Sequence, residues 1–195
     1  MIESLSHLDE SLFLSLNELH TSWLDPLMMW FSGNVIWMPL YVFLLFQLSK
    51  LPRPHAIVAL AGIAVGIALS DQFTSSLLKP LVERPRPTWN KDIGTLVHTV
   101  DGYRGGHYGF PSSHAANTFC VAVFLILILR KPWTRWLLLW AAVVSYSRIY
   151  LGVHYPGDVL TGAALGTLFG ALTYWLYKIT CAAIDKKKAE KNASG

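Results

Sequence analysis

The sequence predicts an all-α integral membrane protein, a single domain built as a bundle of about five transmembrane helices. Two observations lead to this prediction. Of the 195 residues, 53% are hydrophobic and only 14% are charged, whereas a soluble domain carries about 25% charged residues. Apolar stretches long enough to cross a bilayer also recur along the chain. The composition therefore excludes a water-soluble globule, a coiled coil and a disordered chain.

Five stretches have the length of a membrane-spanning helix, which needs roughly 17–25 mostly apolar residues. They are residues 26–48, 56–78, 112–129, 133–153 and 159–177. The second contains one acid, Asp71, for which we expect a polar network beneath the outer surface or a helix–helix hydrogen bond. Residues 4–20, within an interfacial segment 1–22, predict an amphipathic helix lying at the membrane surface. If that helix dips inward, it becomes a sixth element of the bundle.

The distribution of cations orients the bundle. Alternate loops and the C-terminal tail hold ten of the sixteen Lys and Arg residues, and cytoplasmic loops are the ones that carry such an excess. We therefore expect residues 181–195 to form a basic cytoplasmic tail behind a single domain at 1–180. The loop at 79–111 then faces the periplasm or the outside, and the protein lies in the inner (cytoplasmic) membrane.

Small residues mark the last stretch. Gly162, Gly166 and Gly170 recur at every fourth position, a pattern typical of close helix packing in membranes. The two cysteines, Cys120 and Cys181, lie in apolar runs and indicate small buried side chains. They provide neither a disulfide framework nor a metal site.

The first polar cluster on the outer side is the segment 79–87. It places Lys79, Arg84 and Arg86 within eight residues, among three prolines. Proline fixes φ and removes a backbone donor, so we expect an extended, rigid segment. Arginine offers a planar fork that matches phosphate oxygens, and lysine offers a point charge. For Arg84 we expect only an interfacial, snorkelling side chain.

A second cluster precedes the third apolar stretch. Ser112 and Ser113 follow Pro111, which is a signal for the start of a helix. The N-terminus of a helix binds anions through its free N–H groups and its dipole. His114 has no capping purpose there that Ser113 does not already serve. We therefore expect it to have a chemical role.

The third cluster joins the fourth and fifth stretches. Pro156 is expected at the first position of the last helix, which leaves Asp158 in its first turn. His154 then lies in the turn before the helix, within reach of that carboxylate. A carboxylate that holds one imidazole nitrogen fixes the tautomer and leaves the other nitrogen free to attack or to accept a proton.

Together the clusters predict phosphoryl chemistry. Lys79, Arg86 and Arg148 can stabilise the charge on the equatorial oxygens of a phosphoryl group in its transition state. One histidine can act as the nucleophile and the other as the general acid for the leaving oxygen. No metal ion is needed if the cations supply the charge. The expected reaction is hydrolysis of a phosphomonoester or of a diphosphate end, through a phosphohistidine.

Three strings of residues resemble a known family, the type 2 phosphatidic acid phosphatase superfamily. They are Lys79-x6-Arg86-Pro87, Pro111-Ser112-Ser113-His114 and Ser147-Arg148-x5-His154-x3-Asp158. The family pattern is KxxxxxxRP, PSGH and SRxxxxxHxxxD in this order, so every spacing fits. Ser113 is the one departure, since the pattern has Gly there.

The resemblance implies a role for each matching residue. It makes His154 the nucleophile oriented by Asp158, and His114 the group that protonates the leaving oxygen. The phosphate would be held by Lys79, Arg86, Ser112 and Arg148 together with the backbone N–H of Ser113. The resemblance also implies that the reaction needs no metal and no other cofactor.

The substrate is expected to be a lipid phosphate whose tail stays in the bilayer; no feature indicates a nucleic-acid partner, and the oligomeric state is left open. Undecaprenyl diphosphate, hydrolysed to undecaprenyl phosphate, is the first expectation. Lipid A and phosphatidylglycerophosphate are the alternatives. A different class, a protein that binds or moves lipid phosphates without cleaving them, would need the cations but not the His154–Asp158 pair.

Residues outside the three clusters are given lesser roles. His98, Asp101 and His107 share the outer loop, but their spacing matches no metal-binding pattern. The long loop at 80–110 carries Trp89, Tyr103, Arg104 and Tyr108 with several glycines, and its part at 90–105 contains Tyr103, Arg104 and three of those glycines. We expect it to contact the head group of the substrate.

Overall fold

The structure is a computed structural model that describes residues 2–193, and over these residues it is helical without a β-strand. The α-helices are α1 (Ile2–Asn17), α2 (Asp25–Ser32), α3 (Met38–Ser49), α4 (Arg53–Asp71), α5 (Lys79–Val82), α6 (Ser113–Leu129), α7 (Trp136–Tyr150) and α8 (Pro156–Ala193). Short 3₁₀ turns occur at Val35–Trp37, Pro87–Trp89 and Pro132–Arg135, and a π-helical segment occupies Gln72–Leu78. The predicted fold class is confirmed.

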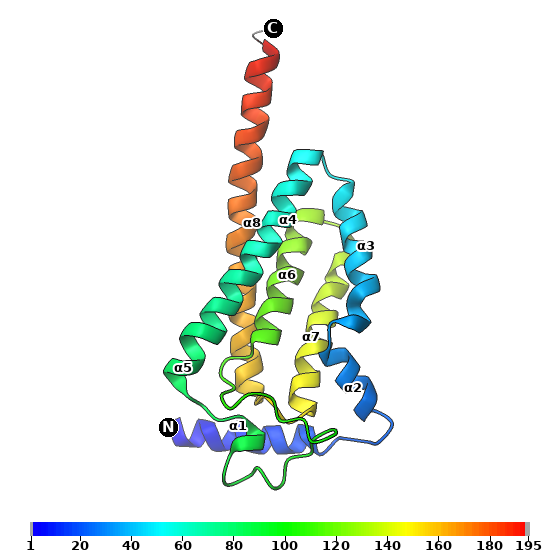
Figure 1. The fold of residues 1–195 in the computed structure, drawn as a ribbon. Helices are drawn as coiled ribbons and strands as arrows, with labels where there is room; N and C mark the ends of the chain where they lie inside the picture. The colour runs from blue at the N-terminus through cyan, green and yellow to red at the C-terminus, as the bar shows by residue number, and fades with distance from the viewer. Residues whose placement is uncertain (1, 194–195) are drawn as a thin grey trace.

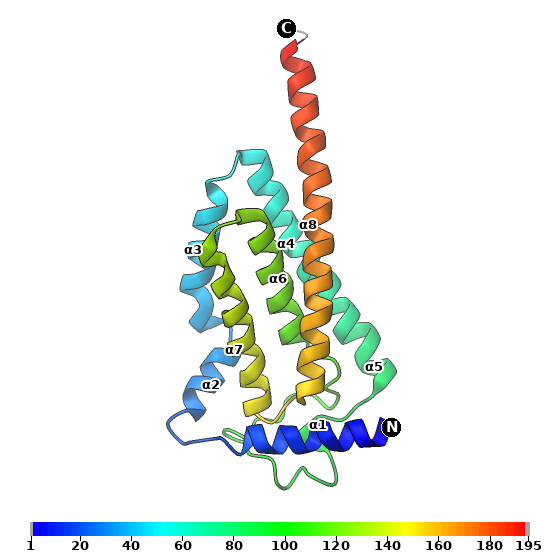
Figure 2. The ribbon, with the colours of Figure 1, turned by 180° about the vertical axis from the view of Figure 1, so that it is seen from behind.

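The helices form one bundle with a long projection (Figures 1 and 2). Helices α3, α4, α6, α7 and α8 run along the bundle, α1 lies across one end, and the C-terminal half of α8 extends beyond the other end. The loop between α5 and α6 lies at the same end as α1. That end therefore gathers all three of the predicted clusters.

The contact between α6 and α8 depends on the glycine repeat. A Cβ at Gly166 would lie 2.1 Å from the carbonyl oxygen of Ala116 in α6. Cβ atoms at Gly162 and Gly170 would lie within 3 Å of the carbonyl oxygens of Ser112, the N-cap of α6, and of Cys120. Only a residue without a side chain permits this approach, so the prediction of close helix packing is confirmed.

Two helical segments among the described residues have the length and apolar composition to cross a membrane, Arg53–Val82 and Pro156–Ala193. A bent pair, Asp25–Ser32 with Val35–Ser49, makes a third if it is one span. Helices α6 and α7 coincide with two further predicted stretches, but have only 17 and 15 residues. At 1.5 Å per residue they measure roughly 23–26 Å, slightly less than a typical hydrocarbon core. Five spans therefore remain a prediction.

The first predicted span, 26–48, is not one straight helix. Its two halves meet at 73°, with Gly33 and Asn34 between them. The prediction of an unbroken helix was wrong because an uncharged run looks continuous in sequence, while a glycine followed by an asparagine permits a break. Backbone freed from a helix at membrane depth is tolerated where it is buried in protein or lines a cavity.

The prediction that 79–87 is extended was partly wrong. The helix that starts at Arg53 continues through the π-helical segment to Val82, so Lys79 is helical. It stops at Glu83, which has the left-handed φ of 50°. Only from there is the chain extended, and Pro85 pairs with Tyr108 in an isolated bridge. π-Helical turns are frequent at functional sites because the extra residue re-aims the side chains that follow.

Helix α1 is the amphipathic helix that residues 4–20 predict. Its Phe13 is fully buried and packs edge-on against Tyr155 at a centroid distance of 5.4 Å, whereas Leu8 is 67% exposed. The side chain of Asn17 donates to the carbonyl of Tyr150 at 2.8 Å. Helix α1 thus crosses the site end of the bundle rather than running along it (Figure 1).

Candidate active site

The turn between α7 and α8 presents the third cluster as the sequence predicts. Helix α8 starts at Pro156 and places Asp158 in its first turn. The Nδ1 of His154 lies 3.3 Å from the Oδ2 of Asp158, and both side chains are buried. The backbone N–H of Tyr155 donates to the same Oδ2 at 3.0 Å. Because Nδ1 is held by the carboxylate, Nε2 is the nitrogen left for chemistry.

The environment of His154 keeps the imidazole neutral. Burial removes water from the charged form, and the cations Arg86, Arg148 and Lys79 repel it, so the pKa of His154 lies well below the usual 6.5. All three predicted phosphate-binding cations thus lie within electrostatic range of this imidazole. A neutral imidazole has the free electron pair that a nucleophile needs.

Arg84 is not the snorkelling side chain that the sequence suggests. Its guanidinium donates to the Oδ1 of Asp158 at 2.9 Å, and it lies 4.0 Å from the centre of the Tyr155 ring. Asp158 therefore has one oxygen towards His154 and the other towards Arg84. The partner of Arg84 lies 74 positions away in the chain, so no local pattern reveals it.

Helix α1 supplies a second acid to this group. The other arm of Arg84 contacts the Oδ2 of Asp9 at 2.8 Å. The Oδ1 of Asp9 accepts the backbone N–H of Gly157 at 2.8 Å, in the first turn of α8. Asp9, Arg84, Asp158 and His154 thus form a continuous chain of polar contacts from α1 to the imidazole.

Arg86 is buried and held by the outer loop. Its backbone N–H donates to the carbonyl of His107 at 3.0 Å, and its Nε donates to the carbonyl of Tyr108 at 3.1 Å. Gly109 is required nearby, because a Cβ there would lie 2.9 Å from the Oδ2 of Asp158 and 3.1 Å from the Cγ of Arg86. The loop therefore fixes the arginine with the η nitrogens left over for an anion.

Arg148 is held from two sides near the C-terminus of α7. One η nitrogen donates to the hydroxyl of Ser32, at the end of α2, and the other donates to the hydroxyl of Tyr103 at 3.0 Å. The Nε is buried and has no protein partner. A buried donor without a partner costs free energy, so this nitrogen is suited to a phosphate oxygen.

Lys79 reaches the start of α6. Its Nζ donates to the hydroxyl of Ser113 at 2.8 Å, and this hydroxyl lies 2.8 Å from that of Ser75. Ser75 in turn donates to the Oδ1 of Asp71 at 3.1 Å. This is the polar network beneath the site that the sequence suggests for Asp71. It also gives Ser113 a side-chain contact that a glycine would not provide.

The start of α6 completes the arrangement. Ser112 is the N-cap, and its own N–H donates to the carbonyl of Asp158 at 3.0 Å, which joins α6 to α8. His114 lies in the first turn of α6, exposed, within electrostatic range of Arg148, His154, Lys79 and Arg86. The structure therefore brings all eight predicted site residues to one end of the bundle.

Two histidines outside the three clusters, His20 and His98, contact other side chains. His98 contacts the carboxylate of Asp25 at 3.0 Å and stacks on His20 at 3.7 Å. Within residues 2–193 no group of three or more His, Cys, Asp or Glu side chains is arranged to hold a metal ion. Sequence reasoning missed Ser32, Asp9 and Arg84 as contacts of the site, because each acts through a distant partner.

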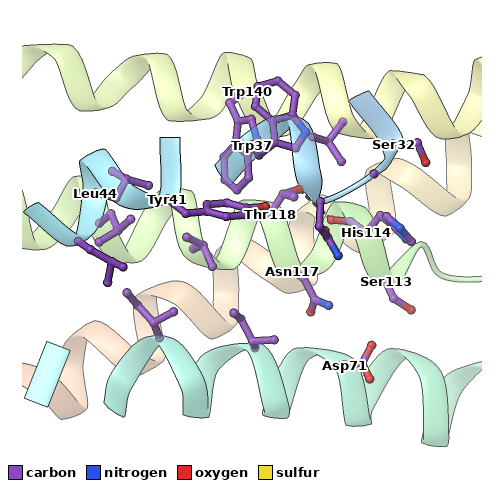
Figure 3. Close-up of a pocket in the computed structure, with 18 of the residues that line it drawn as sticks. Ser32, Trp37, Tyr41, Leu44, Asp71, Ser113, His114, Asn117, Thr118 and Trp140 are labelled. Carbon is purple, nitrogen blue, oxygen red and sulfur yellow. Dashed lines mark hydrogen bonds between the residues drawn. The ribbon is translucent and has the colours of Figure 1, made fainter. Parts of the chain in front are cut away.

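A cavity of about 600 Å³ lies beside the site, between α3, α4, α6 and α7 (Figure 3). His114 and Ser113 lie at one end of it and Leu44 lies at the other. Apolar side chains form most of its wall. The polar centre therefore opens into an apolar space inside the bundle.

These features define a class of protein. A neutral imidazole with a carboxylate partner, a second imidazole and three cations suit phosphoryl transfer to a histidine. Their position at the end of an apolar helix bundle places the chemistry at a membrane. The class is that of membrane-embedded phosphatases that act on lipids.

Comparison with known proteins gives the family. A model of the PAP2 superfamily matches residues 56–180, so the chain belongs to this superfamily of lipid phosphatases. It is 46% identical to a lipid A 4'-phosphatase of Bacteroides thetaiotaomicron over 92% of this chain and 82% of that one. A lipid A 4'-phosphatase of Porphyromonas gingivalis is 36% identical over 90% and 75%. An undecaprenyl-diphosphatase of Sulfolobus acidocaldarius is 28% identical over 83% and 75%.

Two crystal structures share the fold. LpxE of Aquifex aeolicus superposes with a TM-score of 0.61 at 26% identity, covering 84% of this chain and 92% of that one. A transmembrane PAP2-type phosphatidylglycerolphosphate phosphatase of Bacillus subtilis gives a TM-score of 0.63 at 23% identity, covering 94% and 87%. The fold of the chain is thus that of a transmembrane PAP2 protein.

Proposed function

We propose that this protein removes a phosphate from lipid A, or from a lipid of the same kind, through a phosphohistidine formed on His154. The observation that carries the chemistry is the buried His154–Asp158 pair, which lies beside three cations. The choice of substrate is supported by the higher identity to the two lipid A 4'-phosphatases than to the undecaprenyl-diphosphatase. Lipid A thus replaces undecaprenyl diphosphate as the first expectation.

In the first step, the Nε2 of His154 attacks the phosphorus and a P–N bond forms as the P–O bond to the lipid breaks. The leaving oxygen takes a proton from His114, which is its general acid. Asp158 stabilises the positive charge that develops on the imidazole of His154, and it holds the ring by Nδ1 throughout. The dephosphorylated lipid then leaves.

In the second step, water attacks the phosphorus of the phosphohistidine. His114, now neutral, takes a proton from the water, the P–N bond breaks, and inorganic phosphate is released. The equatorial oxygens carry negative charge in both transition states. Lys79, Arg86 and Arg148 offset this charge, together with the N–H groups at the start of α6.

The test is phosphate release by the purified protein in detergent containing EDTA. The substrates are lipid A, undecaprenyl diphosphate and phosphatidylglycerophosphate, and His154→Ala is measured beside the wild type. We expect release from lipid A in preference to the other two, and a fall of at least about a thousandfold in the variant. Release by His154→Ala at the wild-type rate would contradict the role of His154. A preference for undecaprenyl diphosphate would overturn the choice of substrate.

A further inference from the structure

Arg148 uses both of its η nitrogens on hydroxyl groups of the protein. Its Nη1 donates to the hydroxyl of Ser32 in α2, and its Nη2 donates to the hydroxyl of Tyr103 in the outer loop at 3.0 Å. The guanidinium is also within electrostatic range of both histidines, His114 and His154. A phosphate at the site therefore meets an arginine of whose nitrogens only Nε has no partner in the described part of the chain.

The two hydroxyls contact different sides of this guanidinium. The planar group carries Nε and Nη2 along one edge, and Nη1 takes no part in that edge. Tyr103 thus contacts the nitrogen that shares an edge with the unpartnered Nε, whereas Ser32 contacts the nitrogen that does not. A phosphate oxygen bound at Nε is therefore closer to the hydroxyl of Tyr103 than to that of Ser32.

The hydroxyl of Tyr103 still has its own proton to donate. A phenol accepts through its oxygen and donates one hydrogen, and here the oxygen accepts from Arg148. Within residues 2–193 the hydrogen has no acceptor. Because the guanidinium polarises the phenol that it donates to, the O–H becomes a stronger donor towards an anion.

The fold fixes Tyr103 in this place. Its backbone N–H donates to the carbonyl of Val100 at 2.9 Å, and Val100 is buried in one hydrophobic cluster with Leu151, just beyond the end of α7. On the other side in sequence, the carbonyl of Arg104 accepts from the hydroxyl of Thr88 at 3.2 Å. The phenol is therefore held at the site before any ligand binds.

Tyr103 also lies within electrostatic range of a second arginine. Burial and the charge of Arg148 lower the pKa of the Arg86 guanidinium, and the phenol of Tyr103 acts in the opposite direction. Two residues further on, Gly105 has a φ of 63°, and a Cβ there would lie 2.0 Å from the Nη1 of Arg86. The segment 103–105 thus covers both arginines, Arg148 with the phenol and Arg86 with the backbone.

We propose that Tyr103 is a further phosphate-binding residue, which accepts a hydrogen bond from Arg148 and donates its O–H to an oxygen of the substrate phosphate. The proposal rests on the proposed function and deepens it, because the loop that we expect to contact the head group then contacts the phosphate as well. Tyr103 belongs to none of the three strings that match the superfamily pattern. Those strings alone would therefore not identify it.

The test measures the binding of inorganic phosphate, which carries no lipid and so reports on the phosphate site alone. Bound phosphate raises the melting temperature of the purified protein in detergent, and a titration at constant ionic strength gives Kd. Tyr103→Phe keeps the ring, whose centre lies 5.6 Å from the guanidinium of Arg148, and removes only the hydroxyl. We expect Kd for phosphate to rise about tenfold, and kcat/KM on lipid A to fall by a similar factor.

Two variants are the matched controls. Ser32→Ala removes the other hydroxyl that holds Arg148, on the side away from Nε, and should raise Kd for phosphate no more than about twofold. Tyr146→Phe removes a phenol that packs against the same hydrophobic cluster as Tyr103, and its Kd should equal that of the wild type. The melting temperature without phosphate shows that each variant is folded.

Three results would overturn the proposal. An equal rise in Kd in Tyr103→Phe and Ser32→Ala would mean that the phenol only positions Arg148. An unchanged Kd in Tyr103→Phe would mean that the phenol does not reach the phosphate, and a wild type that phosphate does not stabilise would contradict the binding site itself. Failure of the proposed function is a separate result, since the wild type would then bind inorganic phosphate and release none from lipid A.

Discussion

At the scale of single residues, the state of His154 governs both chemistry and stability. Burial and the neighbouring cations hold its pKa well below the usual 6.5. In the unfolded chain the same imidazole binds a proton as the pH falls through 6.5, while in the folded protein it stays neutral. The unfolded state then holds more protons, so the free energy of unfolding decreases as the pH falls below that value and is fully retained above it.

The measurement is the melting temperature of the wild type and of His154→Gln in detergent, at a series of pH values from above to below 6.5, the usual pKa of histidine. The melting temperature of the wild type should fall more steeply on acidification, because the variant lacks the group that resists protonation. Titrating groups that do not contact His154 contribute equally to both proteins and cancel. Parallel curves would mean that His154 is charged in the folded state.

Most of the candidate site could be predicted because its residues lie in three short strings. The spacing of His154 and Asp158 is local, since both belong to one turn and the start of one helix. Arg84 was misinterpreted because both of its acidic partners come from distant parts of the chain. A cation beside prolines has the same appearance in sequence whether it faces lipid or a buried carboxylate.

At the scale of elements, α1 is more than a surface anchor. It holds Asp9 against Arg84 and against the first turn of α8. We expect Asp9→Asn to lower kcat about tenfold with little change in KM. Arg84 would lose one of its two anchors, and the Asp158–His154 pair would lose its fixed geometry, whereas the cations that bind phosphate are untouched.

The matched control is Glu10→Gln on the same helix. Glu10 contacts Asn90 of the outer loop and is not part of the chain of contacts to Asp158. The kcat and the melting temperature of the Glu10→Gln protein should stay near the wild-type values. The test is to measure kcat and KM on lipid A for both variants. If Asp9→Asn lowers the melting temperature and leaves kcat unchanged, Asp9 has a structural role alone.

The starts of helices could be predicted from the sequence, whereas irregularities within helices could not. The starts of α6 and α8 were predictable from Ser112 and Pro156, because capping and the fixed φ of proline act locally. The break at Gly33 and the π-helical segment before Lys79 were not. Both arise where a helix adjusts to the site and to the cavity, and hydropathy alone does not record such adjustments.

At the scale of the whole molecule, charge and shape agree on an orientation. The lysines at 186–188 lie in the part of α8 that extends away from the site end of the bundle (Figure 1). An excess of lysine and arginine marks the cytoplasmic side, so we expect α1 and the loop between α5 and α6 to lie on the other side. A phosphatase with this orientation would act on lipids of the outer leaflet.

Cysteine labelling tests this orientation, because both native cysteines, Cys120 and Cys181, are buried. Thr95→Cys adds an exposed thiol to the outer loop, and Lys187→Cys adds one to the projecting end of α8. In intact spheroplasts, a membrane-impermeant maleimide should label the loop thiol, and the α8 thiol should react only after the membrane is permeabilised. The reverse pattern would place the site in the cytoplasm, and its substrate would then come from the inner leaflet.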